Sequence, residues 1–344
     1  MRLIVAVLSI SLFIRCEAPK KNAYSYHLLS GQTMGTYYKV TAKYPDSSVT
    51  SVMVQAIIDG ALKEINQAVS TYIDDSDISI INQSKANEAV RVENEHLAFN
   101  LDRSLHWYNA THGYMDISVM PLVNYWGFGY EGKRGINRID SAAVDSINRY
   151  VRLNKWDFSV SGIIKKRYDE QQLDMSALAK GYAVDYIAHI LETLGSENYL
   201  VDIGGEVKAK GINASGTVWS LGINTPYIEA DVTDYQVVVR LEDKAMASSG
   251  NYRNYHKIQD GVYGHTIDPI TGYPYQDSLL GVSIITDECI DADAIATACM
   301  AMGYTKAATF ITNQPDVAAC FLVGSADGAL NLKLANGFIR YLVE

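Results

Sequence analysis

Hydrophobic residues recur along this chain with two different periods, and the periods predict where helices and strands lie. Between residues 53 and 69 apolar residues return every four positions, which is typical of a helix with one buried face. N-cap residues such as Ser176 and stops at Gly113, Gly195 and Gly303 delimit other helical segments. The pattern predicts helices over residues 53–69, 95–110, 141–150, 176–195 and 291–302.

Short runs rich in β-branched and aromatic residues lie between these helices and are bounded by turn residues. They predict strands over residues 37–44, 199–203, 206–210, 218–223, 236–241, 280–286, 318–323 and 338–343. Helices gather in the first half of the chain, and strands follow one another in the second half. This order favours an α+β fold over a regular βαβ alternation.

The composition is that of an ordinary globular protein. The chain has 344 residues, of which 48% are hydrophobic and 20% charged, and no linker rich in Pro or Ser divides it. We therefore expect one compact catalytic unit over residues 28–344, with one or two lobes. The net charge of −10 and the absence of a basic stripe argue against nucleic acid as a partner.

The first residues form a targeting signal. A basic start is followed by an apolar run over residues 3–14, too short to span a bilayer, and then by Cys16. Residues 1–16 resemble a lipoprotein signal in which Cys16 becomes lipidated, and residues 17–27 form a tether. Arg15 stands where such signals have a small residue, so plain secretion and a retained anchor stay open.

The other cysteines, Cys289, Cys299 and Cys320, are odd in number and form no CxxC pair. In a chain of this length a disulfide framework is not expected. We interpret the three as small buried hydrophobic residues.

A carboxylate and a hydroxyl share one face of the last predicted helix. Asp293 and Thr297 are four positions apart, and hard oxygen ligands of this kind suit Mg²⁺ better than zinc. The alternative is structural: Asp291 caps the helix, Asp293 complements its dipole, and Thr297 only fills space.

The segment 174–185 places Lys180 and Gly181 near a helix N-terminus. Free N–H groups, the helix dipole and a cation together make a plausible anion site. The same residues also fit a capped amphipathic helix whose lysine is solvated.

Three further segments are candidates for a pocket. Residues 247–255 and 264–272 concentrate Ser, Asn, Arg, His and Asp, which are costly to bury without partners. Residues 113–129 are rich in aromatic side chains that could line a pocket for a flat ring or simply fill the core. His265 has its own alternative, a core histidine bonded to a backbone carbonyl.

Together and in this order, these segments resemble the ApbE family of FAD:protein FMN transferases. The resemblance covers nearly all of the chain after residue 30. Its segments are residues 33–36, 70–72, 113–129, 174–185, 199–205, 249–255, 265–272 and 293–303.

The resemblance implies a set of site residues. Mg²⁺ would be held by the side chains of Asp293 and Thr297 and by the backbone carbonyl of Ala177. FAD, bound between the lobes if there are two, would contact Met34, Tyr72, Tyr114, Met115, Asp116, Asp174, Lys180 and Ile267. Tyr114 and Met115 stand where the family often has Ala-Phe, so the ring contact there can differ.

The resemblance also implies the reaction. A threonine or serine hydroxyl of a target flavoprotein attacks the riboflavin-side phosphorus of FAD, and AMP leaves. The metal and Lys180 would stabilise the charge that develops. His265 is the first candidate for the general base, with Asp293 or a metal-bound water as the fallback.

Two other functions fit the same residues, an FAD pyrophosphatase that yields FMN and AMP and a non-catalytic FAD-binding lipoprotein. For the transferase, the family implies an acceptor in a membrane redox complex. The expected location is the periplasmic side of the membrane, the inner one before the outer one, with the chain anchored through Cys16.

Overall fold

An eight-stranded antiparallel sheet forms the centre of the computed structural model, which describes residues 25–44, 48–131, 139–225, 235–251, 255–258, 261–276, 278–325, 327 and 329–343. Its strands, in spatial order, are β1 (Tyr26–Thr33), β2 (Thr36–Lys43), β5 (Asn198–Ile203), β6 (Glu206–Lys210), β9 (Lys244–Gly250), β12 (Leu279–Thr286), β13 (Ala318–Gly324) and β14 (Leu330–Ala335). The α+β class predicted from the sequence is confirmed.

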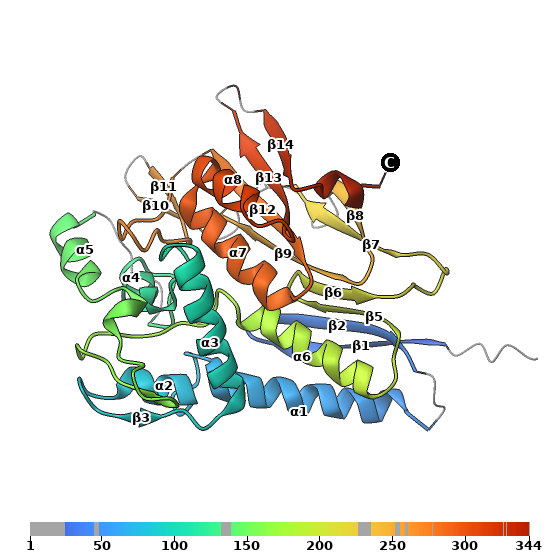
Figure 1. Cartoon of the computed structure of the whole chain (residues 1–344), viewed down its shortest axis with the longest axis horizontal. Helices are drawn as coiled ribbons and strands as arrows, with labels where there is room; N and C mark the ends of the chain where they lie inside the picture. Colours follow the sequence, from blue (N-terminus) through green and yellow to red (C-terminus); the bar gives the residue numbers. More distant parts are fainter. Residues whose placement is uncertain are drawn as a thin grey trace, which may run out of the picture.

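Helices cover one face of this sheet (Figure 1). The helices that pack on it are α1 (Ser51–Val69), α6 (Ala179–Thr193), α7 (Cys289–Met302) and α8 (Tyr304–Thr312). The remaining helices are α2 (Asp77–Gln83), α3 (Glu95–Ala110), α4 (Met120–Tyr125) and α5 (Ser141–Asn148), with the 3₁₀ turns η1 (Ile117–Val119), η2 (Leu153–Lys155) and η3 (Phe338–Tyr341).

Three two-stranded ribbons complete the described secondary structure. They are β3 (Val90–Arg91) with β4 (Ile163–Ile164), β7 (Trp219–Asn224) with β8 (Tyr235–Leu241), and β10 (Tyr255–Ile258) with β11 (Gly261–Gly264). The ribbon β7–β8 and η3 cover the second face of the large sheet, because Val239 and Phe338 pack with Met246 and Leu322 in a separate small core.

Side chains alternate between two cores along each central strand. In β9, Ala245 and Ala247 point into the main core beneath the helices, whereas Met246 points into the small core. This alternation follows from the two-residue period of a strand. The sheet therefore separates a helix-covered face from a ribbon-covered face.

Several expected elements differ from those observed. Residues 338–343 do not form a strand: Gly337 adopts a left-handed conformation, η3 follows, and Phe338 is fully buried. The fourth helix begins at Ala179 instead of Ser176, because the side chain of Asp174 accepts hydrogen bonds from the Ser176 N–H and hydroxyl and holds it in a turn. β1 begins at Tyr26, inside the expected tether.

The expected signal of residues 1–16, including Cys16, and most of the tether lie outside the described residues. Among the helices that the structure describes, none has the length and apolar character needed to cross a membrane.

The three cysteines of the described chain are free and buried, as expected. Cys289 and Cys299 lie in the main core and Cys320 in the small core. Burial raises the pKa of all three thiols, that of Cys320 to about 12.

Candidate functional site

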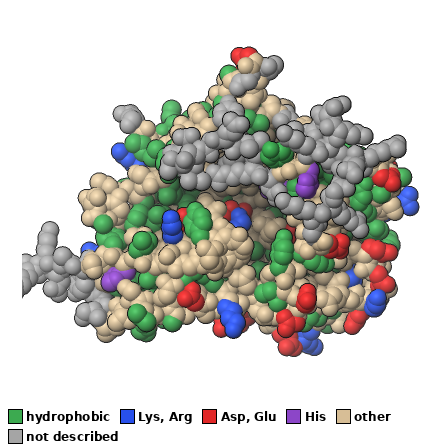
Figure 2. Space-filling view, turned by 180° about the vertical axis from the view of Figure 1, so that it is seen from behind, with side chains coloured by type: hydrophobic (Ala, Val, Ile, Leu, Met, Phe, Trp, Pro, Cys, Tyr) green, Lys and Arg blue, Asp and Glu red, His purple; other side chains and the backbone are tan. Residues whose placement is uncertain are grey.

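Two adjoining cavities, of about 430 Å³ and 610 Å³, open beside the N-terminal end of α6, and the 430 Å³ cavity also runs along α7 from Asp293 to Ala301. They share lining residues, among them Tyr72, Asp174 and Lys180, so they form one continuous cleft. Figure 2 shows that the face opposite to that of Figure 1 is hollowed near its centre, with acidic, basic and hydrophobic side chains at the edge. The combined space is in the range of small-molecule sites.

A buried cluster of charged side chains occupies one wall of the 430 Å³ cavity. Lys180, near the start of α6, forms an ion pair with Glu206 at the start of β6. Asp293, one turn into α7, accepts a hydrogen bond from the Gly181 N–H at 3.1 Å. Two carboxyl groups thus surround one ammonium group on this wall.

Burial sets the protonation of this cluster. Burial raises the pKa of Glu206 and of Asp293, although Lys180 opposes the shift in both. Burial alone would lower the pKa of Lys180, but Glu206 and Asp293 outweigh it and raise that pKa overall. Lys180 is therefore a permanent cation at the cleft.

The positions of these groups depend on a close contact between α6 and α7. A Cβ atom on Gly181 would lie 2.4 Å from the Cys289 carbonyl oxygen, so only glycine allows the two backbones to approach this far. Asp185 of α6 accepts hydrogen bonds from the N–H groups of Cys289 and Ile290, both at 2.9 Å. One helix thus caps the other and fixes Lys180 relative to Asp293.

Asp174 connects the wall that carries the charge cluster to the apolar wall on the other side of the cleft. Its N–H donates to the carbonyl of Ile117 in η1 at 2.7 Å, and its carboxylate holds the Ser176 turn. Burial raises the pKa of Asp174, and the carboxylate in turn contributes to a raised pKa of the neighbouring Tyr72 hydroxyl, where burial is the main cause.

The opposite wall of the cleft is mainly apolar. Val119, Met120, Val123 and Phe128 come from η1, α4 and the turn that follows. Asp116 lies among them, fully buried, and caps η1 through hydrogen bonds from the N–H and hydroxyl of Ser118. Burial raises the pKa of Asp116 to about 6 despite these hydrogen bonds.

His265 lines the cleft with Ile267 and Pro269. Its ring is edge-on to Phe128, with ring centroids 6.3 Å apart. The expected turn after it is present: the Gly272 N–H donates to the Asp268 carbonyl at 2.8 Å. Residues 252–254 of the polar segment before it lie outside the described residues.

The structure brings nearly all of the predicted site residues to this cleft. Those that line it are Met34, Tyr72, Tyr114, Asp116, Asp174, Ala177, Lys180, His265, Ile267, Asp293 and Thr297. Met115 differs: its side chain is fully buried in the main core and does not line either cavity. Its neighbours in the turn, Tyr114 and Asp116, do line the cleft, so any part of Met115 in binding is through the backbone.

Within the described chain, no group of three or more His, Cys, Asp and Glu side chains is arranged to hold a metal ion. The expected metal ligands, Asp293, Thr297 and the Ala177 carbonyl, include only one carboxylate. A search for acidic and thiolate clusters would not identify such a set. All three residues nevertheless line the same cavity.

Glu206 is the main lining residue that the sequence did not identify. It is the first residue of the predicted strand 206–210 and directly follows the segment 199–205 that resembles the family. One carboxylate oxygen, Oε1, binds Lys180, and the other, Oε2, is buried without a hydrogen-bond partner. A glutamate that alternates with apolar residues on a central strand was the available signal.

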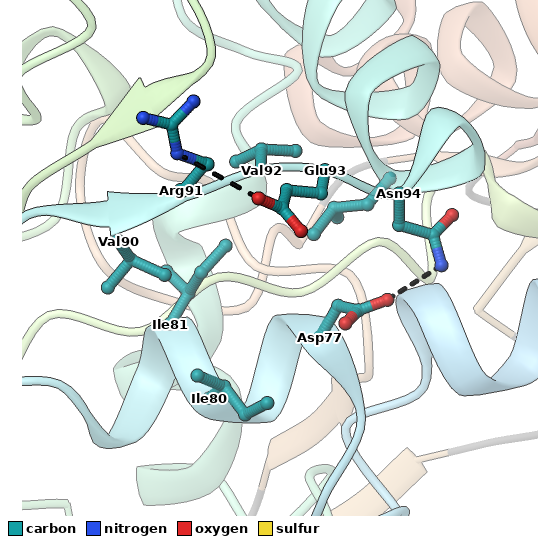
Figure 3. Close-up of a pocket in the computed structure, with 9 residues that line it drawn as sticks. Asp77, Ile80, Ile81, Val90, Arg91, Val92, Glu93 and Asn94 are labelled. Carbon is teal, nitrogen blue, oxygen red and sulfur yellow. Dashed lines mark hydrogen bonds and ion pairs between the residues drawn. The ribbon is translucent and has the colours of Figure 1, made fainter.

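A second groove, far smaller at about 120 Å³, lies between α2 and the start of α3 (Figure 3). Its polar groups serve local structure: Asn94 caps α3 and donates to Asp77 at 2.7 Å, and the Arg91–Glu93 pair is exposed to solvent. This groove offers no comparable concentration of buried charge.

Comparisons with known proteins agree with the geometry. A family profile described as the ApbE family matches residues 34–321. The chain is 34% identical to the FAD:protein FMN transferase of Vibrio cholerae serotype O1 over 94% of each protein. It is 31% identical to the protein of that name from Haemophilus influenzae, over 98% of this chain and 97% of the relative.

A solved structure, the flavin transferase ApbE from Vibrio cholerae, is similar over 92% of this chain and 99% of its own. The TM-score is 0.84 at 31% identity.

Proposed function

The chain belongs to the ApbE family, and on this premise we propose that it transfers the FMN half of FAD to a hydroxyl group of a target protein and releases AMP. The observation that carries this proposal is the pairing of two unlike walls in one cleft. A permanent cation beside buried carboxylates faces a mainly apolar wall. FAD has the same division, with a charged pyrophosphate and a flat apolar ring.

The apolar wall suits the flavin ring, and the adjoining cavity provides the length that a dinucleotide needs. Met34 and Asn66 line the far end of that cavity, and Tyr72 stands where the two cavities meet. Lys180 then lies near the pyrophosphate. A lysine acts there as a point charge against the developing negative charge of the phosphates.

We also propose that the site takes Mg²⁺, held by Asp293, Thr297 and the carbonyl of Ala177. The donors are oxygens, as Mg²⁺ requires. Two observations fit a divalent cation here: the carboxylates outnumber the ammonium group on this wall, and the Glu206 Oε2 atom is buried without a partner. When bound, the ion would neutralise phosphate charge.

The transfer step exchanges a phosphoanhydride bond of FAD for a phosphoester bond to the acceptor. The acceptor hydroxyl oxygen, from threonine or serine, forms a bond to the riboflavin-side phosphorus. The bond from that phosphorus to the bridging oxygen breaks, and AMP leaves with the bridging oxygen. The hydroxyl proton passes to a base and then to solvent. His265, which lines the cleft, is our choice for this base.

Replacement of His265 by alanine tests that role. We expect the transfer rate to fall by about 10²- to 10⁴-fold with FAD affinity retained. A variant with the normal transfer rate would assign the proton to another group, with Asp293 next in line.

We further propose an exported, lipid-anchored protein that acts on a redox-complex subunit at the periplasmic side of a membrane. The support is in the sequence: the apolar run of residues 3–14, Cys16 directly after Arg15, and a polar tether. Mass spectrometry of the mature N-terminus tests it. Diacylglyceryl on Cys16 is the expected result, and an unmodified or uncleaved N-terminus would contradict it.

The function itself is tested with the purified chain in mild detergent, FAD and Mg²⁺. AMP release is followed with and without the apo form of a redox subunit that carries FMN on threonine. We expect AMP to form only with the acceptor, whose mass increases by that of FMN. The matched control is Asp293→Asn, which keeps the side-chain shape.

Other outcomes would reassign the protein. AMP and FMN formed equally well without acceptor would indicate an FAD pyrophosphatase. Bound FAD without any AMP in either reaction would favour a flavin-carrying lipoprotein.

A further inference from the structure

A third recess, of about 220 Å³, adjoins the cleft on the other face of the sheet. It shares Gly204 and Ser248–Gly250 with the cleft, so the two spaces meet at this point. Its floor is formed by β9 and β12, and one side by the end of β7. The recess thus meets the cleft from the face of the sheet opposite to the helices.

On the ribbon-covered face of the sheet, large apolar residues give way to small residues where this recess lies. Along β9 and β12 the ribbon-covered face begins with Met246 and Ile285, which belong to the small core. Toward the cleft the same face continues with small residues, Ser248 and Gly250 on β9 and Gly281 and Ser283 on β12. The Ser248 and Ser283 hydroxyls are hydrogen-bonded at 2.7 Å. A small core that ends in glycine and serine leaves space unfilled.

The main chain of β9 borders this space. β6 pairs with β9 only from Val207 to Ala209, opposite Met246 to Lys244, and then turns away at Gly204-Gly205. β9 continues to Gly250. In the part of the chain that the structure describes, no strand pairs with this side of β9 beyond Met246. An edge of this kind accepts an extended peptide through main-chain hydrogen bonds.

We propose that this recess receives an extended segment of the acceptor protein, which pairs with β9 at Ser248–Gly250 and brings its hydroxyl to the phosphate. This inference rests on the proposed function. Three observations support it: continuity with the cleft, the open strand edge, and a lining of glycines and serines that leaves room for a second polypeptide. FAD would occupy the two larger cavities, so its phosphate meets the acceptor at the junction.

Substitutions that fill the recess test the proposal. Gly281 has an ordinary φ, and a Cβ atom there would lie 3.4 Å from the Ser249 carbonyl oxygen and 3.6 Å from Leu322 Cδ1, which are ordinary van der Waals contacts. Gly281→Ala and Gly281→Val reduce the space in two steps. Ser283→Val does so independently with a residue that favours strands. Ser220→Val, on the exposed part of β7, is the matched control.

The experiment uses the full chain in mild detergent, the same acceptor subunit, and varied concentrations of each substrate. We expect Gly281→Val and Ser283→Val to raise the KM for the acceptor about tenfold or more. The affinity for FAD in the absence of acceptor should stay within about twofold, and Gly281→Ala should be intermediate. Ser220→Val should behave as wild type.

The failures are distinguishable. A wild-type protein that transfers no FMN would overturn the proposed function and this inference together. A wild type that transfers FMN, with both filled variants unchanged in acceptor KM, would overturn the recess alone. A parallel loss of FAD affinity would also overturn it, because the recess would then belong to FAD.

Discussion

The two walls of the cleft solve opposite physical problems. The charged wall keeps Lys180, Glu206 and Asp293 ionisable in a buried setting, and it does so by fixing two helices against each other at Gly181. The apolar wall comes from short elements, η1 and α4, and encloses a single carboxyl group, Asp116, that burial pushes toward its neutral form.

The difference shows how one cleft can bind both halves of a molecule such as FAD. Burial raises the pKa of the carboxyl groups on both walls, but on the charged wall a cation that itself lines the cleft, Lys180, opposes the shift. Substitutions on the first wall should therefore act on the reaction, and those on the second wall on binding and pH dependence.

Among the substitutions that compare the two walls, Asp293→Asn on the charged wall should have the largest effect. The amide keeps the shape and can still accept the Gly181 hydrogen bond, but the charge is lost. We expect the transfer rate to fall by about 10²- to 10³-fold. Steady-state kinetics at several Mg²⁺ concentrations measure this, with thermal unfolding as the control for folding. A variant of normal rate would show that this wall is structural.

The second effect is a pH dependence from the apolar wall. The pKa of Asp116 is about 6 in the folded protein against an ordinary 3.8, so the folded state binds its proton more tightly than the unfolded state. The stability contribution is present below pH 4 and is lost as pH rises through 6, by about 3 kcal/mol.

Urea unfolding of the wild type and of Asp116→Asn between pH 4 and 7 measures this contribution. The difference between the two free energies of unfolding should decline as pH rises, whatever constant offset the amide introduces. Parallel pH profiles would contradict a raised pKa at Asp116.

A third effect concerns the contact that positions the charged wall. Gly181→Ala places a methyl group against the Cys289 carbonyl and should lower the free energy of unfolding by about 1–3 kcal/mol. Gly60→Ala is the control, because nothing lies within 4 Å of a Cβ atom at that helical position. There we expect a gain of about 0.4–1 kcal/mol. Equal effects at both glycines would refute the close approach.

The smallest effect is expected for Phe128→Leu on the apolar wall. Loss of an aromatic contact is worth about 0.5–1.5 kcal/mol, so the affinity for FAD should fall severalfold. The transfer rate at saturating FAD should equal that of the wild type. Fluorescence titration with FAD measures the affinity, and a fall in rate without a fall in affinity would place the ring elsewhere.

Much of this arrangement was predictable from the sequence, and the exceptions have physical causes. The apolar residues of β5, β6 and β12 predict these strands. The four-residue spacing of Asp293 and Thr297 predicts that their side chains share one face of a helix. β9 was not predicted as a strand, because Ala, Ser and Gly have low strand propensity and pairing with β12 decides its conformation.

Glu206 was not predicted as a site residue for a similar reason. Its role depends on Lys180, which is 26 positions away in sequence and becomes its neighbour only when α6 packs on the sheet. The capping of α7 by Asp185 is also a tertiary effect, since the sequence suggested Asp291 as the cap. Asp291 instead binds Arg103 and Trp107 of α3.

The burial of the thiols has a consequence for chemistry outside the site. Because Cys289, Cys299 and Cys320 are enclosed and their pKa values are raised, each stays in the protonated form that oxidants attack slowly. These three cysteines form no disulfide and expose no thiolate that could form a wrong one. Its activity should therefore be indifferent to the redox state of its surroundings.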